Sequence, residues 1–436
     1  MSESGGGSAV VARLNGSMTE QREPEIRDTY RPGTLGTPRA RTLITATLLG
    51  FSLVLSGCAI GTEPSSPAPQ LAGEDQRAVD EIVERSFEDH DLVSLIGEIV
   101  IDGETVAQFA HGEAYAGHPA TADHSFRNGA VAIAYLSIAL LRLSERGELD
   151  LDAPIAPWLP DLPDADVVTP RMLITMTSGY PDFVADEGFL DALVEDPFRE
   201  WSNRELIEIG LASDRVFEPG TNWDYSHTGI VVLGEVISRA SGKPLREVLQ
   251  EEVLEPAGLK HTFSDQTAAI PKPLHAFTAE RGVYEDSTYW NPSWTLANGA
   301  VQTTTVGDMA SSFDRIIGRG ELLEHASWQQ LIAPDLIGFG AELDGCRTCH
   351  TLTEEFSYGL GVFHRNGWIA QTPLFGGYSA SVTTLPAPRS PDGRSLTIAV
   401  AAVVGEDGYE DWTGALPNWA DTVAVELAEA LSDSGR

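Results

Sequence analysis

The segment from His124 to Pro160 has the layout of an active-site helix, in which side chains one turn apart could perform nucleophilic and acid–base chemistry. Arg127 precedes a glycine turn, an apolar helix follows, and an exposed GELDLDAPI turn ends it. A nucleophile at position 130 and a base at position 133 would share one helix face, because residues three apart are neighbours there. Those positions hold Ala130 and Ile133, which can neither attack a carbonyl carbon nor accept a proton.

The elements that must position this helix are predicted at both ends of the chain. Apolar residues at helical spacing indicate an amphipathic helix over Glu74–Asp91, and a last helix is expected over Pro417–Leu431. Strand-like runs near both ends are separated by turn pairs typical of hairpins: Asp102-Gly103, Asn366-Gly367 and Asp392-Gly393. The middle, residues 124–345, is largely helical. We therefore predict an α+β domain whose antiparallel sheet is built from both chain ends, with the terminal helices on it and a large helical insertion.

Several segments, in order along the chain, resemble the serine β-lactamase and penicillin-binding protein superfamily, on its class C β-lactamase, D,D-peptidase and esterase branch. FRNGAVAI resembles F-R-x-G-S-x-x-K, and VTPRMLITMTSGYPDF resembles I-T-x-R-x-L-L-T-H-T-S-G-L. PGTNWDYSH resembles P-G-x-x-x-x-Y-S-N, and YGLGVFHRNGWIAQTPLFGGYSA resembles the strand that carries the K/H-T/S-G motif. The resemblance runs from about residue 76 to the end and implies a β-lactamase/transpeptidase-like fold.

The resemblance also implies acyl transfer, in which a serine attacks a carbonyl, a lysine assists its deprotonation and a tyrosine relays protons. The matching positions in this sequence are Ala130 for the serine, Ile133 for the lysine, Tyr225 for the tyrosine, His227 for an asparagine, and Gln371-Thr372-Pro373 for H-T-G. Loss of nucleophile and base together removes a factor on the order of 10⁶ from kcat. We therefore expect degenerate motifs without ordinary serine hydrolase activity.

Three other serines and one histidine are candidates to replace the missing nucleophile and base. Ser125 precedes the glycine turn and Ser137 lies two turns inside the helix, and neither has a base three residues on. Ser178 in TSGY is expected to be a turn residue. His227 is either a buried, hydrogen-bonded histidine or a general base near neutral pH, with Tyr225 as its partner in a rearranged site. The acidic run of Asp182, Asp186 and Glu187 is expected to be a solvated loop.

The first 57 residues predict a lipoprotein-type signal segment. The apolar run Leu43–Cys58 is too short to span a bilayer comfortably, follows arginines and ends in small residues, which is typical of an export signal. LSGC at 55–58 resembles the bacterial lipobox, in which the cysteine is lipidated. We expect Cys58 to become the lipidated N-terminus, residues 58–75 to form a flexible tether, and residues 76–436 to form the β-lactamase-like domain. The protein would then be exported and lipid-anchored to the cell membrane on its extracytoplasmic side.

The remaining cysteines, Cys346 and Cys349, lie in DGCRTCH. In an exported protein a local disulfide is the favoured reading. C-x-x-C-H also fits c-type haem attachment, and zinc is a further alternative, although no second ligand pair at suitable spacing is visible. We expect neither a cofactor nor a metal. Nucleic acid is not expected as a partner, because the net charge of −37 leaves no basic footprint for phosphates.

The favoured function is that of a binding or regulatory pseudoenzyme at the cell envelope. Its expected ligand is a small molecule or a peptidoglycan peptide in the degenerate cleft, by analogy with the superfamily alone. One alternative is a hydrolase of amide or ester substrates through a rearranged site. The other is a purely structural surface protein.

Overall fold

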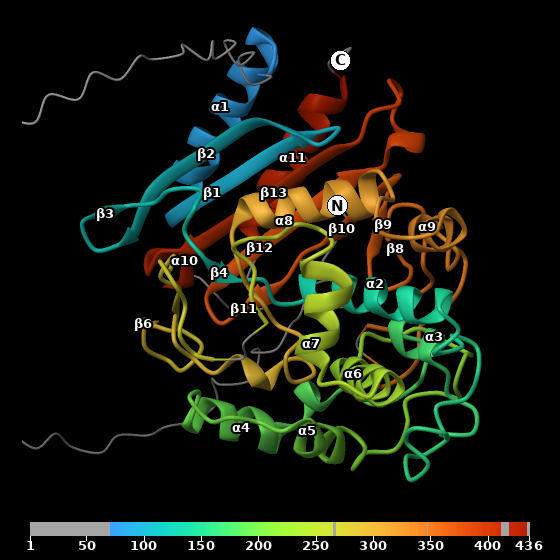
Figure 1. Ribbon diagram of the computed structural model, residues 1–436. Coiled ribbons are helices and arrows are strands. Elements are labelled where there is room, and N and C mark those ends of the chain that lie inside the picture. The colour runs from blue at the N-terminus through green and yellow to red at the C-terminus, as the bar shows by residue number, and fades with distance from the viewer. Residues whose placement is uncertain (1–69, 265–266, 347, 411–417, 434–436) are drawn as a thin grey trace, which may run out of the picture. The chain divides into compact units, whose positions relative to one another are not determined.

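The computed structural model describes residues 70–264, 267–346, 348–410 and 418–433 (Figure 1). The predicted signal segment, including Cys58, lies outside the described residues, as does most of the tether. No helix within the described ranges combines the length and the apolar character that crossing a membrane requires.

A nine-stranded antiparallel sheet forms the centre of the domain, in the order β3-β2-β1-β13-β12-β10-β9-β8, with β11 paired to β12. Its first strands come from the N-terminal part of the chain and the others from the C-terminal part, which confirms the predicted fold class. The strands are β1 (Leu92–Ile101), β2 (Glu104–Tyr115), β3 (His118–Pro119), β8 (Ser357–Tyr358), β9 (Phe363–Arg365), β10 (Trp368–Gln371), β11 (Leu374–Phe375), β12 (Tyr378–Leu385) and β13 (Leu396–Val404).

Both faces of this sheet are covered, because its central strands are apolar on both sides. Every residue of β12 and β13 is buried. The terminal helices α1 (Gly73–Asp89) and α11 (Trp419–Asp433) cover one face, and α8 (Val306–Phe313) covers the other (Figure 1). The two terminal helices therefore confirm the predictions for both ends of the chain.

The helical region packs below the sheet in Figure 1 and shares one apolar core with its inner face. Its helices are α2 (Val131–Glu145), α3 (Pro170–Ile174), α4 (Glu187–Glu195), α5 (Asn203–Gly210), α6 (His227–Ser241), α7 (Leu245–Leu249) and α9 (His325–Ile332), and α10 (Asp407–Glu410) follows β13. Two further strand pairs are β4 (Phe126–Arg127) with β7 (Thr303–Thr304), and β5 (Phe277–Thr278) with β6 (Glu285–Asp286). Short 3-10 or π turns are η1 (Phe183–Ala185), η2 (Gln250–Leu254), η3 (Pro292–Trp294), η4 (Asp314–Gly318) and η5 (Ala387–Arg389).

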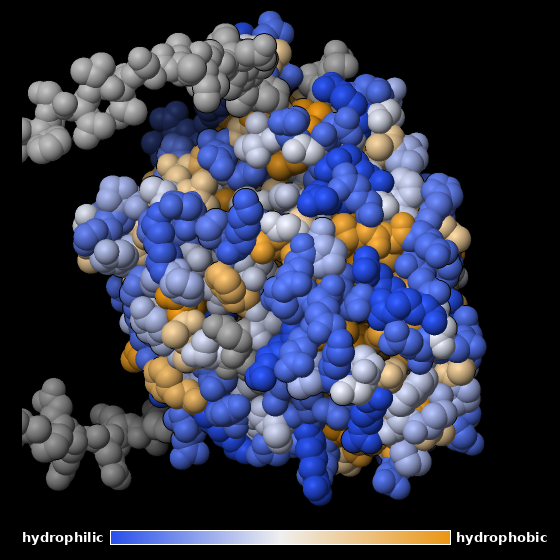
Figure 2. All heavy atoms as spheres, in the orientation of Figure 1, coloured by the Kyte–Doolittle hydropathy of each residue, from blue (hydrophilic) through white to orange (hydrophobic). Residues whose placement is uncertain are grey.

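The outer surface is predominantly polar. Figure 2 shows hydrophilic side chains over much of the visible face, interrupted by smaller apolar patches. The acidic excess of the sequence accounts for this surface, since charged residues are rarely buried without a partner.

Candidate functional site

The turn before α2 is held rigidly by the β4–β7 strand pair. Asn128 and Gln302 bond reciprocally: Asn128 Nδ2 donates to Gln302 Oε1 at 2.7 Å, and the Gln302 backbone N–H donates to Asn128 Oδ1 at 2.9 Å. The chain then turns at Gly129, which has φ +48°, and Ala130 is the N-cap residue of α2. The structure thus places Ala130 at the start of the helix, where the sequence predicted it.

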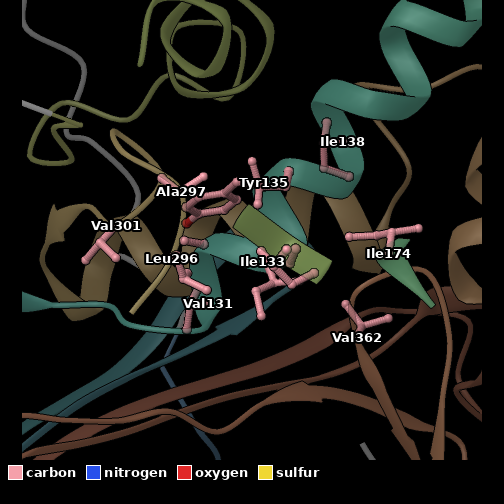
Figure 3. Close-up of a cluster of buried hydrophobic side chains, with 14 of the residues drawn as sticks. Val131, Ile133, Tyr135, Ile138, Ile174, Leu296, Ala297, Val301 and Val362 are labelled. Carbon is pink, nitrogen blue, oxygen red and sulfur yellow. The ribbon is translucent and has the colours of Figure 1, made fainter. Parts of the chain in front are cut away.

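Ile133 lies on the buried side of α2. Its exposed fraction is 0%, and it belongs to the main apolar core. Figure 3 shows Ile133 among apolar side chains that include Val131, Leu296 and Val362. The position that matches the family's lysine therefore carries an apolar side chain that is packed in the core.

The segment at β10 and β11 packs against the turn at Gly129. A β-carbon built on Gly129 would lie 2.8 Å from Pro373 Cβ and 3.3 Å from Phe375 Cβ. Pro373 and Phe375, on either side of Leu374, are thus the residues that contact the turn. Pro373 also separates β10 from β11, because proline has no N–H to continue a ladder of hydrogen bonds.

The third family motif is tied to other parts of the domain. Gln371 is fully buried, and its Nε2 donates a hydrogen bond of 2.6 Å to the carbonyl oxygen of Gly361. The carbonyl oxygens of Thr372 and Pro373 accept bonds of 3.0 and 3.2 Å from Asn418 Nδ2, just before α11. The Gln371 amide carries no charge, so this motif supplies no cation to the site.

Tyr225 lies half-buried in a group of aromatic rings. Its ring stacks on that of Phe363 with a centroid distance of 6.3 Å, and it meets Tyr358 edge-on at 6.3 Å. Burial raises the pKa of the Tyr225 hydroxyl, and the carboxylate of Asp182 raises it further. A raised pKa makes this phenol a poorer proton donor than an exposed tyrosine.

His227 is buried and paired with a carboxylate. Its Nδ1 donates to Asp182 Oδ2 at 2.9 Å, and its backbone N–H donates to Asp182 Oδ1 at 3.1 Å. The prediction of a solvated acidic loop is wrong for Asp182, which is largely buried. Asp186 and Glu187 are exposed as predicted, but Asp186 caps α4 and Glu187 begins that helix, so they do not form a loop. Asp182 is thus a site residue that the sequence did not reveal, because it lies 45 residues before its partner.

The three serines named above as candidate replacements form hydrogen bonds that stabilise the fold. Ser137 donates a 3.1 Å bond to the carbonyl oxygen of Ile133 within α2. Ser125 is buried, and its backbone bonds to the Lys272–Leu274 segment. Ser178 accepts a bond from the Tyr180 N–H, as expected of a turn residue.

Cys346 and Cys349 form the predicted disulfide, with their Cα atoms 5.5 Å apart. Among the described residues, Asp224 and these two cysteines form a group whose ligand atoms lie within 4.8 Å of one another. Because the two sulfur atoms are bonded to each other, they are not thiolates, and only thiolates bind a metal strongly. The Thr348 hydroxyl links this loop to the second motif: it donates to Asp224 and accepts from the Tyr225 N–H.

The order of these elements, from the glycine turn through Tyr225 to the Gln371 strand, is mirrored in known proteins. The profile of the family described as Beta-lactamase matches residues 79–416. The chain belongs to the beta-lactamase family. This confirms the resemblance on which the motif positions rest.

The chain is similar in sequence to an esterase and to a penicillin-binding protein. Esterase EstB from Burkholderia gladioli is 31% identical over 198 residues, which cover 42% of this chain and 50% of that protein. Penicillin-binding protein 4 from Amycolatopsis lactamdurans is 27% identical over 184 residues, 41% of this chain and 43% of that protein. The chain thus spans about half the length of these relatives or less.

Among solved structures, the D-amino acid amidase from Ochrobactrum anthropi SV3, complexed with L-phenylalanine amide, superposes with a TM-score of 0.68 at 22% identity. The match covers 84% of this chain and 100% of the amidase. At this identity the likeness establishes the fold alone.

Proposed function

We propose that this chain is an exported lipoprotein whose beta-lactamase-fold domain has no serine hydrolase chemistry and acts as a binding or regulatory protein at the cell envelope. The observation that carries the proposal is the buried, apolar setting of Ile133 next to Ala130. No nucleophilic oxygen stands at the first position and no base at the second.

The surrounding architecture supports binding without turnover. The turn before α2 retains its hydrogen bonds to Gln302, and Tyr225 retains its place in the second motif. Fixed backbone groups keep their binding capacity when a reactive side chain is lost, because they do not depend on that side chain. The ligand we propose is a small molecule or a peptide of peptidoglycan type.

Ligand-observed NMR with the full domain tests this proposal, using a stem peptide that ends in D-Ala-D-Ala and, separately, benzylpenicillin. We expect reversible binding of at least one probe with no hydrolysis product. Thr372→Val should weaken that binding, and Phe198→Leu, on an exposed ring outside the motifs, should not. Product formation by the wild type would contradict the proposal.

The Asp182–His227 pair favours a second candidate, a hydrolase with a rearranged site. A carboxylate that accepts from Nδ1 leaves Nε2 of His227 as the basic nitrogen, which is the arrangement found in general bases. His227 meets the Tyr225 ring edge-on, with 5.2 Å between the centroids. Ester hydrolysis that is lost in both His227→Ala and Tyr225→Phe would establish this candidate in place of the first.

The contact of Pro373 with Gly129 favours a third candidate, a structural surface protein with a closed cleft. Absence of binding for both NMR probes would support it.

The proposed anchoring is tested separately, by cell fractionation of the wild type and of Cys58→Ala. The wild type should be found with membranes and the variant should be released. A wild type that is already released, or a mature N-terminus elsewhere, would refute lipid anchoring.

A further inference from the structure

A pocket of about 360 Å³ opens beside the edge strand β3 and contains none of the family-motif positions. Its lining residues come from the β2–β3 hairpin, the segment before β4, and a segment 150 residues further along the chain: Tyr115, His118, Pro119, Thr121, His124, Lys272 and Pro273. Its volume lies in the range typical of small-ligand sites.

A strip of four aromatic rings begins at this pocket, and two of them, Tyr115 and His118, line it. The rings of Tyr115 and His118 stack with centroids 4.0 Å apart. Tyr115 also meets His275 at 5.3 Å, and His275 meets Tyr289 at 6.0 Å. Tyr115 and Tyr289 are 39% and 43% exposed, although large aromatic side chains are usually buried. The rings are not coplanar: His118 stacks on one side of Tyr115, His275 is tilted by 46° to Tyr115, and Tyr289 meets His275 edge-on. Tyr115 is therefore the exposed tyrosine that lines the pocket itself.

The charges at the pocket are balanced in pairs. The Lys272 ammonium bonds to the Asp123 carboxylate, and this contact lowers the pKa of Asp123 to about 2. Burial lowers the pKa of His124, whose Nδ1 accepts a bond of 3.0 Å from the Thr121 N–H, so the neutral ring carries its proton on Nε2. At the outer end of the strip, His275 pairs with Asp286 at 2.7 Å.

These pairs provide hydrogen-bond donors and acceptors, and their opposite charges largely cancel. A phosphate or carboxylate attracted to Lys272 would also meet the carboxylate of Asp123, and a cation attracted to Asp123 would meet the ammonium. Hydroxyl groups suit such a pair, because each hydroxyl both donates and accepts. Lys272 lines the pocket and Asp123 lies beside it, so this ion pair favours a neutral polyhydroxylated ligand over an ion.

We propose that this pocket binds one ring of a neutral saccharide, with a sugar face stacked on Tyr115 and its hydroxyls bonded to the Lys272–Asp123 pair and to His124. The apolar C–H face of a pyranose suits stacking on the single Tyr115 ring, and its hydroxyls suit the polar groups of Thr121, His124 and Lys272 in the lining. Ligand sites of this kind combine aromatic surface with a few fixed polar groups.

The backbone pre-forms the polar side of the pocket. Lys272 has φ +46°, a conformation that residues with side chains rarely adopt, and its carbonyl oxygen accepts a 2.9 Å bond from the Ser125 N–H. Leu274 N–H donates to the Ser125 carbonyl oxygen at 2.8 Å. Lys272 is thus held in position by the chain on both sides, and backbone strain of this type is frequent at binding sites.

Isothermal titration calorimetry of the purified protein tests the proposal, with tetrasaccharides of N-acetylglucosamine, glucose (β-1,4 and α-1,4 linked) and mannose as probes. Inorganic phosphate and benzoate serve as anionic comparators. We expect at least one saccharide to bind and neither anion to compete. Tyr115→Ala should weaken binding at least tenfold and Lys272→Met at least threefold. Phe198→Ala, on a more exposed ring that does not line the pocket, should leave binding unchanged.

Three results would overturn the proposal. The first is a failure of every saccharide to bind protein whose circular dichroism is native. The second is equal weakening by Tyr115→Ala and Phe198→Ala, and the third is preferential binding of phosphate or benzoate. Saccharide binding should persist in Tyr225→Phe and Thr372→Val, because the pocket shares no residue with the family site. The outcome is therefore independent of the function proposed for that site.

Discussion

Nδ1 of His227 lies 2.9 Å from Oδ2 of Asp182, in a buried pair at the start of α6. The same carboxylate accepts a second bond from the His227 backbone N–H and a third, of 3.4 Å, from the Val184 N–H. Asp182 therefore fixes the orientation of the histidine ring and also joins η1 to α6. The pair has a structural role whether or not the protein has activity.

Asp182→Ala should destabilise the domain by about 3 kcal/mol, because it leaves two or more buried donors without an acceptor. Asp191→Ala, on an exposed position of α4, is the control and should change stability by less than about 0.5 kcal/mol. Urea denaturation monitored by tryptophan fluorescence measures both. Equal stability of the two variants would show that the His227 pair contributes nothing to folding.

Ala130→Ser combined with Ile133→Lys places a nucleophile and a base on one helix face again. We expect slow acylation by a fluorescent penicillin and little turnover, because Gln371 and Pro373 still differ from the family pattern. The buried lysine should also lower stability by about 4 kcal/mol, since burial shifts lysine pKa values by about 3 units or more. Ile133→Met is the control for the stability measurement, because methionine fills a similar volume without a charge. Rapid turnover by the double variant would show that the rest of the site is intact.

Gly129→Ala should be destabilising for two reasons that can be separated. A side chain at φ +48° costs about 1 kcal/mol, and its β-carbon would clash with Pro373, for about 3 kcal/mol in total. Gly117→Ala is the control, because Gly117 also has positive φ but nothing within 4 Å of the added carbon. It should cost only about 1 kcal/mol. Equal losses in chemical denaturation would mean that Pro373 does not press on the turn.

His364 predicts a specific pH dependence. It is 2% exposed, and burial lowers its pKa from 6.5 to about 3. Between these values the unfolded chain binds a proton and the folded chain does not, so stability present above pH 6.5 is lost as the pH falls. From pH 7 to 4.5 the wild type should lose about 3 kcal/mol more than His364→Leu. Parallel losses in urea titrations at the two pH values would contradict a neutral, buried imidazole.

The turn pairs in the sequence predicted hairpins correctly where the backbone conformation of the turn residues determines the structure. Asn366 and Gly367 both have positive φ, as a two-residue hairpin turn requires, and they join β9 to β10. The Asp392-Gly393 pair also lies in a hairpin, but Pro386, Pro388 and Pro391 lengthen its connection, which includes η5. Proline has no N–H, so these residues cannot extend the strand ladder.

The sequence predicted only those parts of the site that lie within a family motif. The start of α2 at Ala130 and the buried face with Ile133 follow from sequence spacing and apolar character. The contact of Gly129 with Pro373 joins residues far apart in the sequence, and so does the pair of Asp182 with His227. Tertiary packing decides such contacts, and neither residue of a pair carries a local signal for its partner.

The measurement that tests the central claim most directly is covalent labelling of the wild-type protein, followed by intact mass spectrometry. The probes are a fluorophosphonate and a fluorescent penicillin, and an active esterase of the beta-lactamase family serves as the positive control. Both probes require a nucleophilic oxygen, and position 130 carries only a methyl group. We predict no mass increase with either probe under conditions that label the control completely. A stoichiometric adduct on the wild type, mapped to any residue of the domain, would contradict the account.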